Sequence, residues 1–339
     1  MQALHDWLLD TWYGGSRRGA WLLPLAWLFQ ALTALHRALF RTGLRGSYRS
    51  SRPVIIVGNV TVGGTGKTPL VVWLADRLAG RGMRVGVVSR GYGRTGSAAR
   101  RVGPQDAAAV AGDEPLLLVR RTGAAVAVAA DRAEAVRLLE PDCDVILSDD
   151  GLQHHALARD AEIAVVDGRR GLGNGWLLPA GPLRESPGRL ARASAVVVNG
   201  EGFDVPGALR MQVEPIRFVG VHSGETLTLS AFRGRRAHAV AAIGHPERFF
   251  DTLRALGIDV DPRPLPDHAV PDPGQLDFED GAPVLMTEKD AVKCRGFAGP
   301  AHWYLEVGAR FNEADAQRLL AIIDEACRRR ATASLGERR

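Results

Sequence analysis

The segment Val54-Ile-Ile-Val-Gly-Asn-Val-Thr-Val-Gly-Gly-Thr-Gly-Lys-Thr68 is the most informative part of the chain, because an apolar strand runs directly into a glycine-rich turn. Such a turn lets backbone N–H groups converge on an anion, while its lysine and threonine serve phosphate and Mg²⁺. A helix-forming run, 69–76, follows at once. The sequence therefore predicts a nucleotide-binding phosphate loop. Its residues are Thr61, which replaces the usual first glycine, and Val62, Gly63, Gly64, Thr65, Gly66, Lys67 and Thr68.

Length and composition describe a folded protein with room for two domains. The chain has 339 residues, of which 46% are apolar and 24% charged, and its net charge is +5. A basic balance suits an anionic partner such as a phosphorylated metabolite, a membrane surface or nucleic acid. No basic motif interleaved with aromatic residues occurs, so we expect no nucleic-acid partner. The three cysteines lie far apart and form no CxxC pair, which is typical of reduced thiols.

An apolar stretch, residues 20–35, lies within the first fifty residues. As a helix it would be about 24 Å long, which is short beside a hydrocarbon core of about 30 Å. Leucines recur at steps of three and four from Leu25 to Leu39, arginines flank the stretch, and Trp21 and Trp27 could lie at headgroup depth. We therefore expect an amphipathic helix on a membrane surface. The alternatives are a helix packed on the protein's own core and a transmembrane span.

The rest of the chain alternates between strands and helices. Short β-rich runs occur at 84–88, 125–129, 145–147, 163–166 and 195–198. This alternation predicts an α/β fold with a mostly parallel sheet and helices on both faces, in which ligands collect at the carboxyl ends of strands. We expect a membrane-associated segment at 1–50, a phosphate-loop core at 51–210, a β linker at 211–230, a smaller α/β domain at 231–328 and a basic tail at 329–339.

Asp149 and Asp150 follow the predicted strand at 145–147. A strand that ends in carboxylates places an aspartate beside the magnesium of a phosphate loop, although an isolated Asp-Asp pair is more often a turn or a cap. Adjacent side chains of a strand point in opposite directions. We therefore expect one of the two aspartates to contact Mg²⁺ directly and the other to act through water or substrate.

Three further acidic segments have both a plain and a functional interpretation. Asp113 could be a helix N-cap, with Pro115 in the first turn, or it could accept the proton of a hydroxyl that attacks the γ-phosphate. Asp267 and His268 form a loop pair that, in isolation, is more often exposed without a role. The segment 287–290 follows a predicted strand, and its plain interpretation is a helix cap with surface ion pairs.

Seven motifs occur in one order along the chain. They are Gly58-Asn-Val-Thr-Val-Gly-Gly-Thr-Gly-Lys-Thr-Pro69, Ser89-Arg-Gly-Tyr-Gly93, Gly112-Asp-Glu-Pro115, Ser148-Asp-Asp-Gly-Leu-Gln-His154, Leu178-Pro-Ala-Gly-Pro-Leu-Arg-Glu185, Asp267-His268 and Met286-Thr-Glu-Lys-Asp-Ala-Val-Lys293. In this order they closely resemble the tetraacyldisaccharide 4′-kinases of lipid A biosynthesis. Residues 155 and 245 are small departures, since both are histidines here.

The resemblance implies a peripheral or monotopic enzyme on the cytoplasmic face of the inner membrane, expected to be monomeric. Such an enzyme moves the γ-phosphate of ATP, with Mg²⁺, to the 4′-hydroxyl of a lipid A disaccharide 1-phosphate. The family fold is a P-loop NTPase-type α/β domain joined by a β linker to a smaller α/β domain. The N-terminal helix would meet the membrane and the acyl chains of the substrate.

Residue roles also follow from the resemblance. Lys67 and Thr68 would hold phosphate and metal, and Asp149, Asp150 and Glu185 would serve the metal site. Asp113 would be the base, forming a dyad with His268 from the second domain. Asp267 and Arg184 complete the expected catalytic set.

Two rival functions remain open on the residues alone. A dimerising partitioning ATPase has a lysine early in its phosphate loop, where this chain has Val62. A membrane-tethered nucleotide-binding structural protein would have no transfer activity, and its acidic residues and His268 would be incidental.

Overall fold

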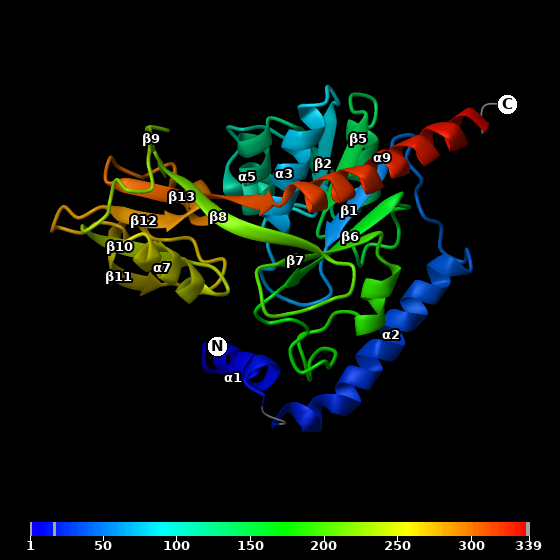
Figure 1. The fold of residues 1–339 in the computed structure, drawn as a ribbon, viewed down its shortest axis with the longest axis horizontal. Helices are drawn as coiled ribbons and strands as arrows, with labels where there is room; N and C mark the ends of the chain where they lie inside the picture. Colours follow the sequence, from blue (N-terminus) through cyan, green and yellow to red (C-terminus); the bar gives the residue numbers. More distant parts are fainter. Residues whose placement is uncertain (1, 16–17, 337–339) are drawn as a thin grey trace.

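The computed structural model describes residues 2–15 and 18–336 and contains one long sheet flanked by helices (Figure 1). The strands are β1 (Val54–Gly58), β2 (Val85–Ser89), β3 (Arg100–Val102), β4 (Ala125–Val128), β5 (Val145–Asp149), β6 (Ala161–Asp167), β7 (Ala195–Asn199), β8 (Leu209–Gly220), β9 (Thr226–Leu227), β10 (Arg236–Ala241), β11 (Asp259–Pro264), β12 (Val284–Thr287) and β13 (His302–Phe311). The α-helices are α1 (Gln2–Tyr13), α2 (Leu23–Arg41), α3 (Lys67–Ala79), α4 (Ala108–Ala111), α5 (Asp113–Thr122), α6 (Arg132–Leu139), α7 (Pro246–Ala255), α8 (Glu288–Cys294) and α9 (Glu313–Gly336). The 3-10 helices are η1 (Arg18–Leu22), η2 (Pro187–Arg192) and η3 (Pro273–Gln275).

The sheet is mostly parallel. Its strands follow the order β11-β10-β12-β13-β8-β7-β6-β1-β5-β2-β4-β3, with β9 beside β8. The antiparallel pairs are β8 with β13, β3 with β4 and β8 with β9. We define β1 to β7 as the core half of the sheet and β10 to β13 as the distal half.

Strand β1 lies inside the core half and is covered on both faces. Ile55 and Val57 belong to an apolar cluster with α3, α5 and α9. Val54 and Ile56 belong to a second cluster, which includes side chains of α6. A strand buried on both faces has a continuous apolar sequence, and this explains the run at 54–57. The predicted mostly parallel sheet with helices on both faces is confirmed.

Strand β8 continues the sheet from one half to the other. It pairs with β7 at its start and runs antiparallel to β13 along most of its length. Figure 1 shows β8 and β13 as two long ribbons that connect the halves. The segment 211–230, expected as a β linker, therefore begins inside a strand of the sheet. The distal half has its own apolar cluster around Phe218, Phe250 and Leu285.

The prediction of Asp113 as a helix N-cap is wrong. Helix α5 begins at Asp113, and Gly112 is the N-cap, with φ of 89°. A Cβ atom on Gly112 would lie 3.1 Å from the Cα atom of Gly91, and this conformation also disfavours any residue except glycine. Pro115 lies in the first turn as predicted. The carboxylate of Asp113 is thus available for contacts outside its own helix.

Helix α2 lies along one side of the molecule (Figure 1, blue) and leaves most of its large apolar residues uncovered, although Ala26 packs against Ala180. The exposed large side chains of η1 and α2 are Trp21, Leu25, Trp27, Leu28, Leu32 and Leu35. By length and composition alone, the segment Arg18–Arg41 could cross a membrane, and only 11% of its most apolar window is buried. The expected amphipathic helix is present, but its apolar face does not pack on the protein's own core.

Candidate active site

The phosphate loop lies between the carboxyl end of β1 and the first turn of α3. Gly66 has φ of 93°, and a Cβ atom there would lie 2.6 Å from the side-chain nitrogen of Asn199. Asn199 donates from the same nitrogen to the carbonyl of Thr65, at 3.1 Å. Glycine at position 66 therefore permits both the turn and the close approach of Asn199. Lys67 and Thr68 follow in the first turn of α3, where backbone N–H groups favour an anion.

Asp149 ends the neighbouring strand β5 and Asp150 follows it, but their surroundings differ. Asp149 is 1% exposed, and one of its oxygens is buried without a hydrogen-bond partner among the described residues. Burial raises the pKa of Asp149 to about 7, and the Glu114 carboxylate adds to this effect. Asp150 contacts two cations, the Nζ atom of Lys67 at 3.5 Å and a guanidinium nitrogen of Arg184 at 3.1 Å. Burial opposes ionisation, yet these cations lower the pKa of Asp150 to about 2.

A buried arginine fixes the end of this strand. Arg132 is 6% exposed, and its guanidinium donates to the backbone carbonyls of Asp149 and Asp150, at 3.2 and 2.7 Å. Asp150 itself has φ of 48°, a conformation that non-glycine residues rarely adopt. Sequence reasoning missed Arg132, because an arginine inside a helix gives no local signal of its partner.

The acidic side chains of the site suit Mg²⁺ that is shared with substrate phosphates better than they suit a metal ion bound by protein ligands alone. Among residues 2–15 and 18–336, no three His, Cys, Asp or Glu side chains gather closely enough to hold a metal. Mg²⁺ usually keeps several waters and binds through one or two carboxylates together with substrate phosphates. The unpartnered oxygen of Asp149 and the hydroxyl-bearing Thr68 beside the loop meet that requirement.

Asp113 and His268 approach each other from the two halves of the sheet. Asp113 opens α5 in the core half, and His268 lies in the loop after β11 in the distal half. The Nδ1 atom of His268 is 3.9 Å from Asp113 Oδ2. This separation is longer than a hydrogen bond. The two predicted members of the dyad are therefore brought together, although 154 residues of chain separate them.

The His268 loop is also held by neighbours on its other sides. Asp267 Oδ1 lies 3.9 Å from His268 Nε2, and the ring of Tyr92 lies against the imidazole with centroids 5.0 Å apart. His268 has φ of 62°, and its backbone N–H donates to the carbonyl of Ala242 at 3.1 Å. Tyr92 comes from the motif at 89–93, whose role the sequence left undefined. That motif supplies an aromatic contact across the halves.

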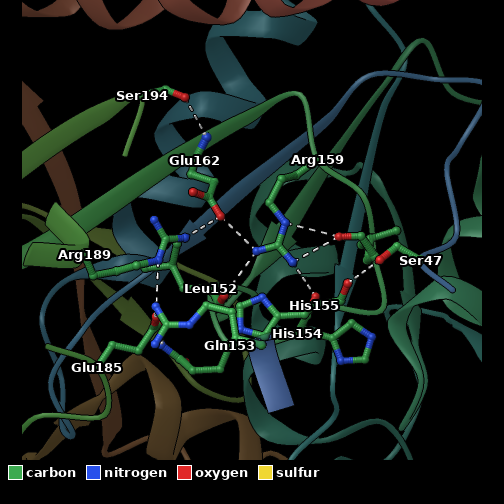
Figure 2. A network of polar contacts seen from close by, with 12 residues as sticks. Ser47, Leu152, Gln153, His154, His155, Arg159, Glu162, Glu185, Arg189 and Ser194 are labelled. Atoms are coloured by element: carbon green, nitrogen blue, oxygen red, sulfur yellow. Dashed lines mark hydrogen bonds and ion pairs between the residues drawn. The ribbon is translucent and has the colours of Figure 1, made fainter. Parts of the chain in front are cut away.

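Glu185 belongs to a network of arginines rather than to the pair of aspartates. It is 5% exposed, accepts a hydrogen bond from Gln153 at 2.9 Å, and forms ion pairs with Arg189 at 3.3 Å and Arg37 at 3.7 Å. Figure 2 shows Arg189 between Glu185 and Glu162, and Arg159 on the other side of Glu162. Arg37 connects this network to α2.

Arg159 of the same network also stabilises the backbone after Asp150 through hydrogen bonds. Arg159 donates to the carbonyls of Leu152, His154 and Leu157 (Figure 2). His155, a departure from the family pattern, lies near His36 and Phe40 of α2, and burial lowers its pKa to about 4. The position that departs from the pattern thus faces the amphipathic helix rather than the phosphate loop.

A cavity of about 320 Å³ lies between the halves beside the phosphate loop. The core half contributes loop glycines, Thr68 and Glu114, and the distal half contributes Ile243, Phe249 and residues of α8. Apolar walls with a few polar groups are typical of a site for a small molecule such as a nucleotide. His245, the second departure from the family pattern, also lines this cavity.

The segment 287–290 does more than its plain interpretation predicts. Thr287 is indeed an N-cap, since its side chain accepts from the N–H of Asp290. The ion pairs, however, are only partly exposed and lie between two helices. Lys289 pairs with Glu114 at 2.9 Å, and Arg121 pairs with Glu288 at 2.7 Å, so both pairs connect α5 to α8. Burial raises the pKa of Glu288 to about 7.

Comparisons with known proteins point to one family over most of the chain. The family model described as "Tetraacyldisaccharide-1-P 4'-kinase" matches residues 18–327. The protein named tetraacyldisaccharide 4′-kinase from Ectopseudomonas mendocina is 51% identical, over 90% of this chain and 92% of the relative. The protein of that name from Azotobacter vinelandii is 50% identical, over 91% of this chain and 93% of the relative.

A solved structure supports the same relationship. The crystal structure of LpxK from Aquifex aeolicus in complex with ATP is 28% identical to this chain, with a TM-score of 0.78. The match covers 91% of this chain and 99% of that chain. These relatives favour a phosphotransferase over the partitioning ATPase and the structural protein considered above. The chain belongs to the tetraacyldisaccharide-1-phosphate 4′-kinase family.

Proposed function

We propose that this kinase transfers the γ-phosphate of ATP to the 4′-hydroxyl of a tetraacylated lipid A disaccharide 1-phosphate, with Asp113 and His268 receiving the hydroxyl proton. The observation that carries this proposal is the meeting of Asp113 and His268 across the two halves, beside the phosphate loop of a chain in this family. Phosphoryl transfer depends mainly on positioning and charge neutralisation, and this site offers both.

The core half would hold the triphosphate. Backbone N–H groups of residues 61–68 surround the β- and γ-phosphates, and Lys67 leaves Asp150 to contact them. Arg184 stays on Asp150 and limits the negative charge that Lys67 would leave behind. The base of ATP occupies the cavity of about 320 Å³ between the halves.

Mg²⁺ would be held by Thr68 and Asp149, with Asp150 acting through water, and it would neutralise charge on the phosphates. The buried, unpartnered oxygen of Asp149 supports the choice of Asp149 as the direct contact. The metal role of Glu185 stays a prediction. Its contacts among the described residues are to Gln153, Arg37 and Arg189, and none of these supports a metal contact.

The base would be completed by closure of the two halves. Asp113 accepts the proton of the attacking 4′-hydroxyl, and His268 orients the carboxylate and shares the proton. A separation of 3.9 Å leaves a short movement before a hydrogen bond can form. Such closure over bound ATP would restrict base catalysis to the loaded enzyme.

We also propose that the kinase works as a monomer on the cytoplasmic face of the inner membrane. The outward side chains of α2, such as Trp27 and Leu32, are more than half exposed and suit the headgroup boundary. A lipid with four acyl chains leaves a bilayer only at high cost. Arg37 of the same helix pairs with Glu185, and Gln153 connects Glu185 to Arg184 beside Asp150, so the membrane surface and the site are close.

The activity is tested with purified protein, Mg-ATP and a lipid A disaccharide 1-phosphate in detergent. Mass spectrometry should detect a product that is heavier by one phosphoryl group. A disaccharide already phosphorylated at the 4′ position is the matched negative substrate. Release of ADP without phosphorylated lipid would contradict the proposed acceptor.

The membrane assignment has its own test, which uses vesicles of anionic phospholipid. Leu28→Asp together with Leu32→Asp should move the protein from the vesicle pellet to the supernatant. The control is Gln30→Asp, which adds a charge to the same helix outside the leucine stripe. Equal sedimentation of the double variant and the control would exclude this face as the membrane contact.

A further inference from the structure

The motif at 286–293 contains a buried lysine that the proposed reaction does not yet use. Lys293 lies on α8, and its side chain is 1% exposed. Its Nζ atom is 3.1 Å from Asp290 Oδ1, 3.0 Å from the carbonyl oxygen of Ala269 and 3.6 Å from Asp113 Oδ2. A buried ammonium is costly unless it is paired and hydrogen-bonded. The position of Lys293 between two carboxylates therefore needs an explanation.

Asp290 anchors this lysine within the distal half. Its side chain is fully buried, and its second oxygen accepts from the backbone N–H of Ala242 at 3.0 Å and from the hydroxyl of Thr287 at 2.6 Å. Asp290 thus uses one oxygen for the fold of its own half and the other for Lys293. The ammonium has a fixed position even though α8 is a short helix.

The same contacts fix the backbone on both sides of His268. The N–H of His268 donates to the carbonyl of Ala242, whose own N–H donates to Asp290. The carbonyl of the next residue, Ala269, accepts from Lys293. His268 has φ of 62°, which a non-glycine residue keeps only where its surroundings hold it. The pair of Asp290 and Lys293 supplies those contacts.

We propose that Lys293 is a positioning residue that sets Asp113 and His268 at their working separation, a role that rests on the proposed function. The ammonium attracts the Asp113 carboxylate from the core half while it holds the His268 loop of the distal half. Asp290 lies closer to the ammonium, at 3.1 Å, than Asp113 does, at 3.6 Å, so Lys293 stays anchored in its own half while it attracts Asp113. Lys293 itself neither gives nor takes a proton in the reaction.

The test compares Lys293→Met with wild type in steady-state phosphoryl transfer to the disaccharide lipid. We expect kcat to fall at least about tenfold, while the KM for ATP changes by less than about twofold, because the lysine acts on the base and not on the nucleotide. Arg81→Met is the control, since Arg81 pairs with Asp324 far from the site. An unchanged kcat in Lys293→Met would overturn the proposal.

A double-mutant cycle separates positioning from a general loss of structure. In the His268→Ala background, Lys293→Met should lower kcat by no more than about twofold, because the group that it positions is already absent. A full tenfold loss in that background would refute the positioning role. If His268→Ala alone keeps wild-type turnover, the proposed dyad fails instead, so the two failures are distinguishable.

Lys293→Met leaves Asp290 as an unpaired buried charge and can prevent folding. The variant that carries both Lys293→Met and Asp290→Asn has no such charge, and the asparagine oxygen can still accept from Ala242. We expect this double variant to fold, as judged by circular dichroism, and to show the same loss of kcat. If neither variant folded, Lys293 would be needed for folding rather than for positioning the dyad, and the proposal would be overturned.

Discussion

The two walls of the active site are built in different ways. The phosphate wall consists of the loop at 61–68 and the aspartates after β5, and all of it belongs to the core half. The base wall consists of Asp113 from the core half and the His268 loop and α8 from the distal half. The phosphate wall has Lys67 and Arg184 on Asp150, whereas Asp113 and His268 are still 3.9 Å apart.

Binding of the triphosphate and the chemical step thus depend on separate parts of one fold. The core half alone presents the groups that hold a triphosphate. The base wall exists only when both halves are in contact, through Lys293, Lys289 and the His268 loop. Changes in the phosphate wall should therefore alter binding of the triphosphate, whereas changes of Asp113, His268 or Lys293, none of which lines the cavity, should alter turnover.

Lys67→Met should have the largest effect, because it removes the mobile charge on the transferred phosphate. We expect kcat/KM for ATP to fall by about a thousandfold, with weaker binding of a non-hydrolysable ATP analogue. The measurement combines initial rates with calorimetric binding. Arg77→Met, on an exposed turn of the same helix, is the control. If Lys67→Met bound the ATP analogue as tightly as wild type, Lys67 would not contribute to nucleotide binding, and the proposed role of the phosphate wall would be wrong.

Asp113→Ala and His268→Ala should each lower kcat by at least about a hundredfold, as for lost base catalysis. The KM for ATP should change little, in contrast to Lys67→Met. Steady-state kinetics at saturating lipid measures both constants. His222→Ala replaces an exposed histidine of the distal half and should behave as wild type. Wild-type turnover from either site variant would overturn that residue's role.

Stability should depend on pH through Asp149 and not through Asp150. The pKa of Asp149 is about 7 in the folded protein and 3.8 as an ordinary aspartate, so the folded state binds more protons between these values. The free energy of unfolding, without nucleotide and Mg²⁺, should therefore fall by about 1.5 kcal/mol as the pH rises from about 5.5 to 7.

Urea unfolding at the two pH values measures this change. Asp149→Asn should remove that part of the fall. Asp150→Asn should not, because the pKa of Asp150 is about 2 and its carboxylate is ionised throughout this range. If the free energy of unfolding fell equally in wild type and in Asp149→Asn, Asp149 would be ionised in the folded protein. Asp149 and Asp150 would then not differ in their protonation.

The sequence predicted the phosphate wall well because its information is local. The apolar run at 54–57, the glycines and the lysine are adjacent in the chain, and each imposes its structure within a few residues. The carboxylates after β5 were also found, since a strand end is visible in the pattern. The resemblance to a known family pointed to Asp113 and His268, which local chemistry alone left ambiguous.

Other features could not be read from local pattern. Gly112 is the cap in place of Asp113, and its φ of 89° and the backbone of Gly91, 3.1 Å from where a Cβ atom would lie, both favour glycine at this position. The ion pairs of α8 lie between the halves because α8 packs against α5, and residues 287–290 by themselves carry no sign of that packing. The role of Lys293 could not be read from its own helix, since Asp290 is a neighbour in α8 but Asp113 and Ala269 lie in two other segments.

Local sequence pattern is enough to specify an α/β protein with a phosphate loop, an acidic strand end and an amphipathic N-terminal helix, because periodicity and glycine-rich turns act over a few residues. The burial of Asp149, the pairing of Asp150 and the position of Lys293 between Asp113 and the His268 loop depend instead on how distant segments pack. Burial and the distance between charges depend on segments that meet through the continuous sheet, and these two quantities govern the electrostatics of the site.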